Sequence, residues 1–183
     1  MAKFDSYGYT LTEACLVCAV GAILLASAIP LFDTAMHSND ADAAAQLIVQ
    51  ELTHARTMAI GNGSGVLIRF DPAANSVVVA PGTGSVKGPF ILPGRTKLQT
   101  NAPSLDTPDN LNSKVLGVGA FQQMTFLNNG AVVDNPAANN IISGTFFLEN
   151  DNQDPSTRRA VTIFGATGKI KMWRFDDGSN TWK

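Results

Sequence analysis

The feature that most constrains this chain is an uncharged apolar run near its N-terminus. Residues 14 to 32 contain no charged side chain and are rich in Ala, Leu, Val and Ile. As an α-helix with a rise of about 1.5 Å per residue, this run crosses most of a hydrocarbon layer about 30 Å thick. No small-x-small cleavage site follows it, so we expect the helix to stay on the protein as a membrane anchor.

Glu13 stands immediately before this run, where a carboxylate is unexpected. A charged side chain costs up to about 3 kcal/mol at the centre of a bilayer and less near the interface. A partner of opposite charge would relieve that cost. Glu13 is therefore the first candidate functional residue.

The residues around Glu13 carry a resemblance to a known family. Gly8, Tyr9, Thr10-Leu11 and Glu13 resemble the type III signal of type IV pilins and pseudopilins, although the family more often has Phe where this chain has Tyr9. The resemblance implies that prepilin peptidase cleaves after Gly8 and that Tyr9 becomes a methylated N-terminus. It also implies that Glu13 pairs with the N-terminal amine of a neighbouring subunit during assembly. Such pairing offsets the desolvation of two charges that are each costly alone in a bilayer.

The helical pattern continues beyond the apolar run and becomes amphipathic over residues 33–60. Apolar side chains recur there at helical spacing, beside Asp, Glu and Gln: Ala44, Leu47, Ile48, Leu52, Ala55, Met58 and Ala59. We therefore predict one long helix that ends at residues 61–63, where two glycines tolerate positive φ. Pro30 removes a backbone hydrogen bond and loosens the helix, and the resemblance implies that this stretch melts locally when the helix packs into a filament.

From Gly65 onward, short β-type runs alternate with turn-forming clusters, which predicts an antiparallel β domain. The predicted strands cover residues 66–70, 76–80, 90–92, 96–100, 115–118, 123–127, 131–133, 141–149, 160–164 and 169–175, with a surface loop at 101–113. The stretches 55–60, 124–130 and 159–171 are similar to FimT/GspH minor pilins.

The resemblance implies an α+β pilin fold, in which a long N-terminal helix packs on a C-terminal antiparallel β-sandwich of two sheets. The expected organisation is a leader at 1–8, a transmembrane and assembly half of the helix at 9–32, its amphipathic half at 33–60, and a β-rich periplasmic domain at 61–183.

Residues suited to catalysis are scarce. Cys15 and Cys18 both lie inside the apolar run, and His37 and His54 lie 17 positions apart on the predicted helix. Neither histidine belongs to a set with the spacing of a zinc motif, and no nucleophile–base arrangement is evident. We predict that the chain is not an enzyme and needs no cofactor.

Acidic and amide side chains cluster before Pro155, and Glu149, Asp151 and Asp154 could offer oxygen ligands to Ca²⁺. Major pseudopilins bind calcium in a late loop, which makes the site worth considering by resemblance. The spacing is not that of an EF-hand, and solvated turns have the same composition. An ordinary polar loop is the favoured interpretation, with no metal.

The C-terminal part is basic, because six basic and two acidic residues follow Ser156, giving a local charge of +4. Gly168-Lys169-Ile170-Lys171 resembles the Gly-Arg-x-Arg phrase through which some FimT-type pilins bind DNA. Lys169 and Lys171 would lie on one face of a strand, and Arg174 is a further candidate. The alternative is that these lysines lie on the solvated face of an edge hairpin closed by Asp177-Gly178.

These observations predict a minor pilin or pseudopilin that assembles through its N-terminal helix into a type II secretion pseudopilus or a type IV pilus. The expected location is the bacterial inner membrane, with a single span, a cytoplasmic N-terminus and a periplasmic C-terminal domain. Expected partners are other subunits, prepilin peptidase and the inner-membrane assembly platform. The alternative is a DNA-uptake pilin; the overall net charge of −2 gives no strong general attraction to nucleic acid.

Overall fold

The computed structural model describes residues 10–82, 84–99, 108–111, 114–134 and 140–183. The chain divides into two compact units, Met1–Met36 and His37–Lys183, and helix α1 (Leu11–Asn62) contributes to both. The cleavage position predicted between Gly8 and Tyr9 lies outside the described residues.

The first turn of α1 has its own capping group. Thr10 Oγ1 accepts a hydrogen bond from the backbone N–H of Glu13 at 3.3 Å, which satisfies one of the free donors of the helix N-terminus. The Thr-x-x-Glu spacing is that of a capping box. The helix is continuous through Pro30, so the local melting predicted for an assembled filament stays a prediction.

The second half of α1 buries one stripe in the β domain. The buried residues recur every three or four positions, as the sequence predicts: Ala41, Ala44, Ala45, Ile48, Leu52, Ala55 and Ala59. Many of them are alanines, which allow a close approach of the strands to the helix. The helix ends at Asn62, and Gly63 follows with φ +63°, as expected for a C-terminal glycine.

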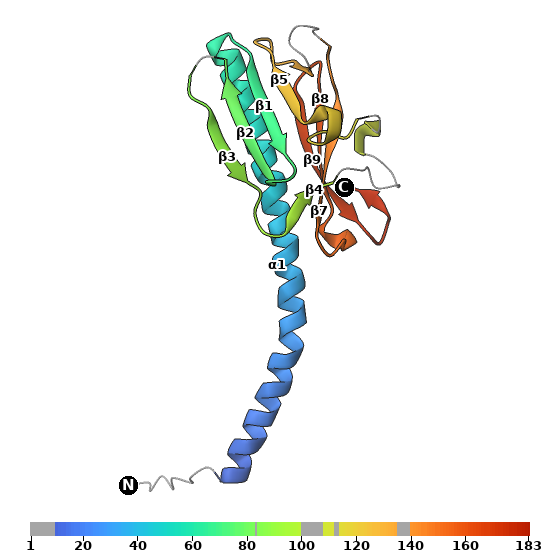
Figure 1. Ribbon diagram of the computed structural model, residues 1–183. Helices are drawn as coiled ribbons and strands as arrows, with labels where there is room; N and C mark the ends of the chain where they lie inside the picture. The colour runs from blue at the N-terminus through green and yellow to red at the C-terminus, as the bar shows by residue number, and fades with distance from the viewer. Residues whose placement is uncertain (1–9, 83, 100–107, 112–113, 135–139) are drawn as a thin grey trace, which may run out of the picture. The chain divides into compact units, whose positions relative to one another are not determined.

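The β domain contains two five-stranded antiparallel sheets (Figure 1). Sheet 1 has the order β3-β2-β1-β5-β6, with β1 (Val66–Asp71), β2 (Ser76–Pro81), β3 (Lys87–Ile91), β5 (Gln123–Phe126) and β6 (Val132–Val133). Sheet 2 has the order β10-β9-β8-β7-β4, with β4 (Thr96–Leu98), β7 (Gly144–Asn150), β8 (Arg159–Phe164), β9 (Lys169–Asp176) and β10 (Thr181–Trp182). Three short 3-10 turns lie between strands: η1 (Pro108–Asn110), η2 (Gly119–Phe121) and η3 (Pro155–Thr157).

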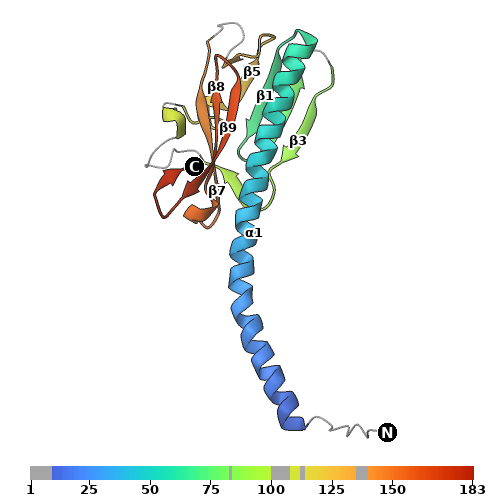
Figure 2. The ribbon, with the colours of Figure 1, turned by 180° about the vertical axis from the view of Figure 1, so that it is seen from behind.

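One hydrophobic core joins the helix to both sheets. Ile48 and Leu52 of α1 share a cluster with Ile68 and Phe126 of sheet 1 and with Val161 of sheet 2. Figure 2 shows this half of α1 running along the strands of the β domain. A smaller cluster lies on the other face of sheet 2 and consists of Phe147, Ala160, Phe175 and Trp182. The predicted α+β fold, with a long helix packed on two antiparallel sheets, is confirmed.

Several predicted strand limits are wrong. Residues 115–118 do not form a strand: Val115 makes an isolated bridge to Thr145, and the chain then turns at Gly117 and Gly119, whose φ values are +84° and +56°. Positive φ is incompatible with an extended strand, so these glycines override the β-type residues around them. Strand β3 begins at Lys87 rather than Phe90, β4 ends at Leu98, and β7 begins at Gly144 rather than Ile141.

Candidate functional site

The N-terminal half of α1 presents an apolar surface with one carboxylate at its start. Its large apolar side chains are exposed around the helix: Leu11, Leu16, Val17, Val20, Ile23, Leu24, Leu25, Ile29 and Phe32. This is the helix in the described structure that is long and apolar enough to cross a membrane. Glu13 lies in its first turn, where the helix dipole favours a negative charge.

The three basic residues proposed from the sequence do not form one cluster. Lys169 and Lys171 lie on the same face of β9, whereas Arg174 lies on the opposite face, because side chains alternate along a strand. Lys171 Nζ is 2.8 Å from Asp109 Oδ1 and 4.8 Å from the ring centre of Trp173. Asp109 therefore already compensates the charge of Lys171.

Arg174 and its cross-strand partner Arg159 face α1. Arg159 is fully buried and pairs with Asp42, and Arg174 Nη2 lies 3.5 Å from the other oxygen of the same carboxylate. Arg174 also donates to Ser38 Oγ at 2.9 Å. Both arginines contribute to the local charge of +4 that the sequence gives for this part of the chain. The structure buries Arg159, because alternation along β8 places its side chain on the helix side of sheet 2.

The three acidic candidates for calcium binding each have a separate role. Glu149 accepts from Arg158 Nε at 2.6 Å, and Asp151 pairs with Lys97 at 2.7 Å. Asp154 caps η3 by accepting from the N–H of Ser156. Among the described residues, no group of three or more His, Cys, Asp or Glu side chains could hold a metal ion. The arrangement is one of salt bridges and a turn cap.

The two histidines lie at different places on α1, and the two cysteines lie on its apolar half. His54 Nδ1 lies 3.9 Å from Glu51 Oε2 on the same helix, and His37 is half-buried at the start of the second compact unit. Cys15 and Cys18 are exposed on the apolar half of α1 and carry free thiols.

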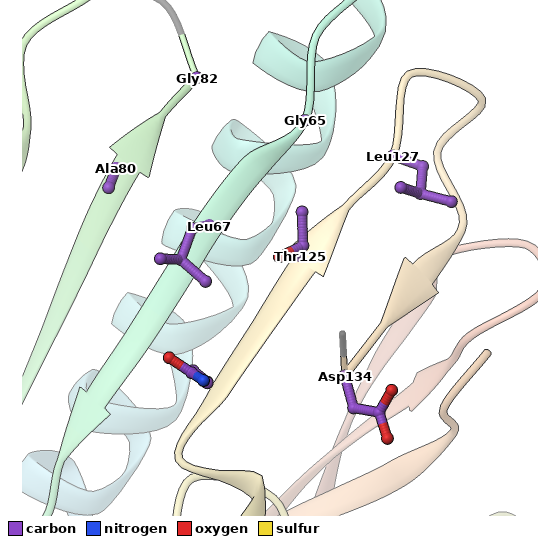
Figure 3. Close-up of a pocket in the computed structure, with 8 residues that line it drawn as sticks. Gly65, Leu67, Ala80, Gly82, Thr125, Leu127 and Asp134 are labelled. Carbon is purple, nitrogen blue, oxygen red and sulfur yellow. The ribbon is translucent and has the colours of Figure 1, made fainter. Parts of the chain in front are cut away.

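A shallow groove lies on the outer face of sheet 1 (Figure 3), with a volume of about 610 Å³. Leu67, Ala80 and Thr125 form its floor at neighbouring register positions of β1, β2 and β5. Asp134 is the one ionisable residue among those that line it. The groove therefore offers a contact surface rather than a pair of groups for acid–base chemistry.

We compared the chain with protein-family models, curated proteins and solved structures. No protein-family model matches the chain, and no curated protein matches its sequence. Among solved structures, the type IV minor pilin FimU of Pseudomonas aeruginosa is 18% identical, with a TM-score of 0.50 over 79% of this chain and 93% of FimU. The minor pseudopilin EpsH from the Type 2 Secretion System of Vibrio cholerae is 15% identical, with a TM-score of 0.47 over 74% of this chain and 97% of EpsH.

The similarity to FimU extends over most of both proteins at an identity too low to carry residue roles. It agrees with the observed order of elements, in which one long N-terminal helix precedes two antiparallel sheets. The chain therefore has the same fold as the type IV minor pilin FimU.

Proposed function

We propose that this chain is a minor pilin or pseudopilin subunit, which assembles through its N-terminal helix into a type II secretion pseudopilus or a type IV pilus. The observation that carries this proposal is the long, exposed apolar half of a helix whose other half is the core helix of a pilin fold.

The apolar surface of the N-terminal half of α1 must be shielded from water. Fully burying a Leu, Ile or Phe side chain is worth about 1.5–3 kcal/mol. Among the side chains that the structure describes between Leu11 and Phe32, nine large apolar ones are exposed. A bilayer covers them before assembly, and the equivalent helices of neighbouring subunits cover them in a fibre. We infer that the form taken up by the assembly platform is a single-pass inner-membrane precursor, with a cytoplasmic N-terminus and a periplasmic β domain; the need to cover this apolar surface supports the membrane span.

Glu13 supplies the specific contact in this proposal. Cleavage after Gly8 by prepilin peptidase creates an amine at Tyr9, four residues from Glu13. The amine of one subunit and the carboxylate of its neighbour neutralise each other in a medium where either charge alone is costly. Pro30 allows the helix to loosen as it packs into the fibre, because proline removes one backbone hydrogen bond.

A second candidate function is DNA uptake through the basic C-terminal strand. The observation that favours it is the position of Lys169, Lys171 and Trp173 on one face of β9. Asp109 compensates Lys171, however, and Arg174 lies on the opposite face. The role as a fibre subunit is therefore better supported.

The test compares Glu13→Ala with the unchanged chain in the host cell. Incorporation is measured as the amount of the protein in sheared fibres or in complexes cross-linked to other subunits, and processing is measured by the intact mass of the purified protein. We expect both forms to begin at methylated Tyr9 and to reach the membrane equally, whereas Glu13→Ala is lost from the fibre.

Thr12→Ala is the matched control, since it changes the same turn without removing a charge, and it should be incorporated normally. Normal incorporation of Glu13→Ala would refute the assembly role of the carboxylate. A protein that still begins at Met1 would refute cleavage after Gly8.

A further inference from the structure

Helix α1 passes from an exposed to a buried environment within a few residues. Residues 32–36 are exposed, the second compact unit begins at His37, and Ala41 is fully buried. Three polar side chains at this boundary contact the β domain: Ser38, Asp40 and Asp42. The first contacts of α1 with the domain are therefore largely polar.

On one side of α1, two arginines of sheet 2 bind the helix. Arg159 of β8 and Arg174 of β9 are cross-strand partners, and both pair with the carboxylate of Asp42. Both also donate to Ser38 Oγ, Arg159 at 3.0 Å and Arg174 at 2.9 Å. Arg159 is fully buried and donates to two backbone carbonyls next to its own strand, so its position is fixed.

The turn between β3 and β4 lies against the opposite side of the helix. Residues two apart on an α-helix point in nearly opposite directions, so Asp40 faces away from Asp42. A Cβ added to Gly94 of this turn would overlap the carboxylate of Asp40, and the φ of Gly94 is +64°. Only glycine suits both the conformation and the close approach. The helix is thus contacted from two sides by the residues that we call the collar: Ser38, Asp40, Asp42, Gly94, Arg159 and Arg174.

Apolar packing contributes little to the same part of α1. Among the described side chains, the fully buried ones that precede Ile48 on the helix are Ala41, Ala44 and Ala45. Alanine buries a small apolar area, and the stabilisation from burial is proportional to that area. A helical segment in a protein depends mostly on its packing, because a short helix is marginal by itself in water. The collar is therefore the main contact that holds residues 38–45 on the domain.

We propose that the collar limits how far α1 can unwind. The helix before Ser38 opens by itself, whereas the helix from Ser38 onward opens only together with the β domain. Pro30 lacks an N–H and so weakens the helix before Ser38, and the collar stops such an opening from spreading into the domain. For an assembled fibre, a consequence that rests on the proposed function, the helix can loosen on packing while the β domain keeps its place on the helix.

The test is hydrogen–deuterium exchange of the full chain in detergent micelles, measured by mass spectrometry. It compares the protection factors of amides 42–46, whose acceptors are the carbonyls of residues 38–42, with those of amides 52–56 in the same molecule. In the unchanged chain the two segments should be equally protected, because both exchange only when the domain opens. Amides 34–37 should exchange at least about tenfold faster, since their opening is local.

Two variants break the collar at different residues. Asp42→Asn should lower the protection of amides 42–46 about tenfold relative to amides 52–56, because it removes charge-assisted hydrogen bonds. Arg174→Gln should lower it about threefold. Arg174 is exposed, so its variant keeps the proposal testable if Asp42→Asn fails to fold. Asn39→Ala is the control, since Asn39 is exposed in the same turn of the helix, and it should leave the ratio unchanged.

The comparison within one molecule separates a local effect from a general loss of stability. If both variants lower the protection of amides 42–46 and 52–56 equally, the collar stabilises only the domain as a whole and the proposal is overturned. It is also overturned if amides 42–46 of the unchanged chain exchange as fast as amides 34–37. The measurement needs no fibre, so its failure would leave the assembly role of Glu13 intact, and loss of that role would leave the collar intact.

Discussion

The substitution Asp42→Asn removes the carboxylate that compensates Arg159. The guanidinium of Arg159 is fully buried. It forms an ion pair with Asp42, which lies on α1. Arg159 also donates to the carbonyls of Ser156 at 2.8 Å and Arg158 at 2.9 Å, and to Ser38 Oγ at 3.0 Å. The substitution keeps the size of the side chain and one acceptor oxygen but leaves a buried positive charge without its counter-charge.

The expected cost follows from this geometry. Breaking a fully buried ion pair by removing one partner costs about 3–5 kcal/mol. Asp42 is 30% exposed, so solvent screens part of its interaction, and Arg159 keeps its neutral acceptors. We therefore expect a loss of about 2 kcal/mol in the free energy of unfolding of the β domain. For a domain of about 150 residues, such a loss lowers the unfolding temperature by about 4–8 °C.

The assay is thermal unfolding of the full chain in detergent, monitored by tryptophan fluorescence. Asp177→Asn is the matched control, because it removes the same charge from an exposed turn, and it should change the unfolding temperature by less than about 2 °C. If Asp42→Asn and Asp177→Asn unfold within about 1 °C of each other, Asp42 does not compensate a buried charge and the reasoning is refuted.

Two further predictions concern the turns of sheet 2. Gly168→Ala should destabilise the domain by at least about 2 kcal/mol, because Gly168 has φ +60° and an added Cβ would lie 2.2 Å from the carbonyl oxygen of Gly130. Gly178→Ala is the control and should be nearly neutral, since the atom nearest to its added Cβ is 3.5 Å away. Equal unfolding temperatures for the two variants would contradict the expectation. The hydrogen bond from Lys183, followed by that from Ser179, lowers the pKa of Asp176 below its ordinary value. A depressed folded-state pKa means that this contribution to the β9–β10 hairpin is complete above the ordinary pKa of Asp, about 4, and is lost as the pH falls through the lower folded value. Acid titration of tryptophan fluorescence should show this transition in the unchanged chain and not in Asp176→Asn; the same transition in both would contradict it.

Local sequence patterns determined much of the architecture. The uncharged run, the recurrence of Ala44, Ile48, Leu52 and Ala55, and the change to short β-type runs after Gly65 predict a long helix followed by a β-rich domain, and the structure confirms this order. The arrangement of the strands in two sheets was implied only by the resemblance to pilins. These features follow from periodicity and turn chemistry, which depend on neighbouring residues. The strand predicted at 115–118 failed because the positive φ of Gly117 and Gly119 is a property of the folded chain.

Only the tertiary structure decided which charges are free. Lys171 and Arg159 look like exposed cations in a basic tail, yet the residues that compensate them, Asp109 and Asp42, lie 62 and 117 positions away in the sequence. Arg56 lies far from the tail in the sequence, yet its Nη2 donates to the carbonyl of Thr167. Electrostatic compensation depends on distance in space rather than along the chain. The sequence therefore determined the order of the elements and the number of cations, and the packing of α1 on two sheets decided which cations are compensated.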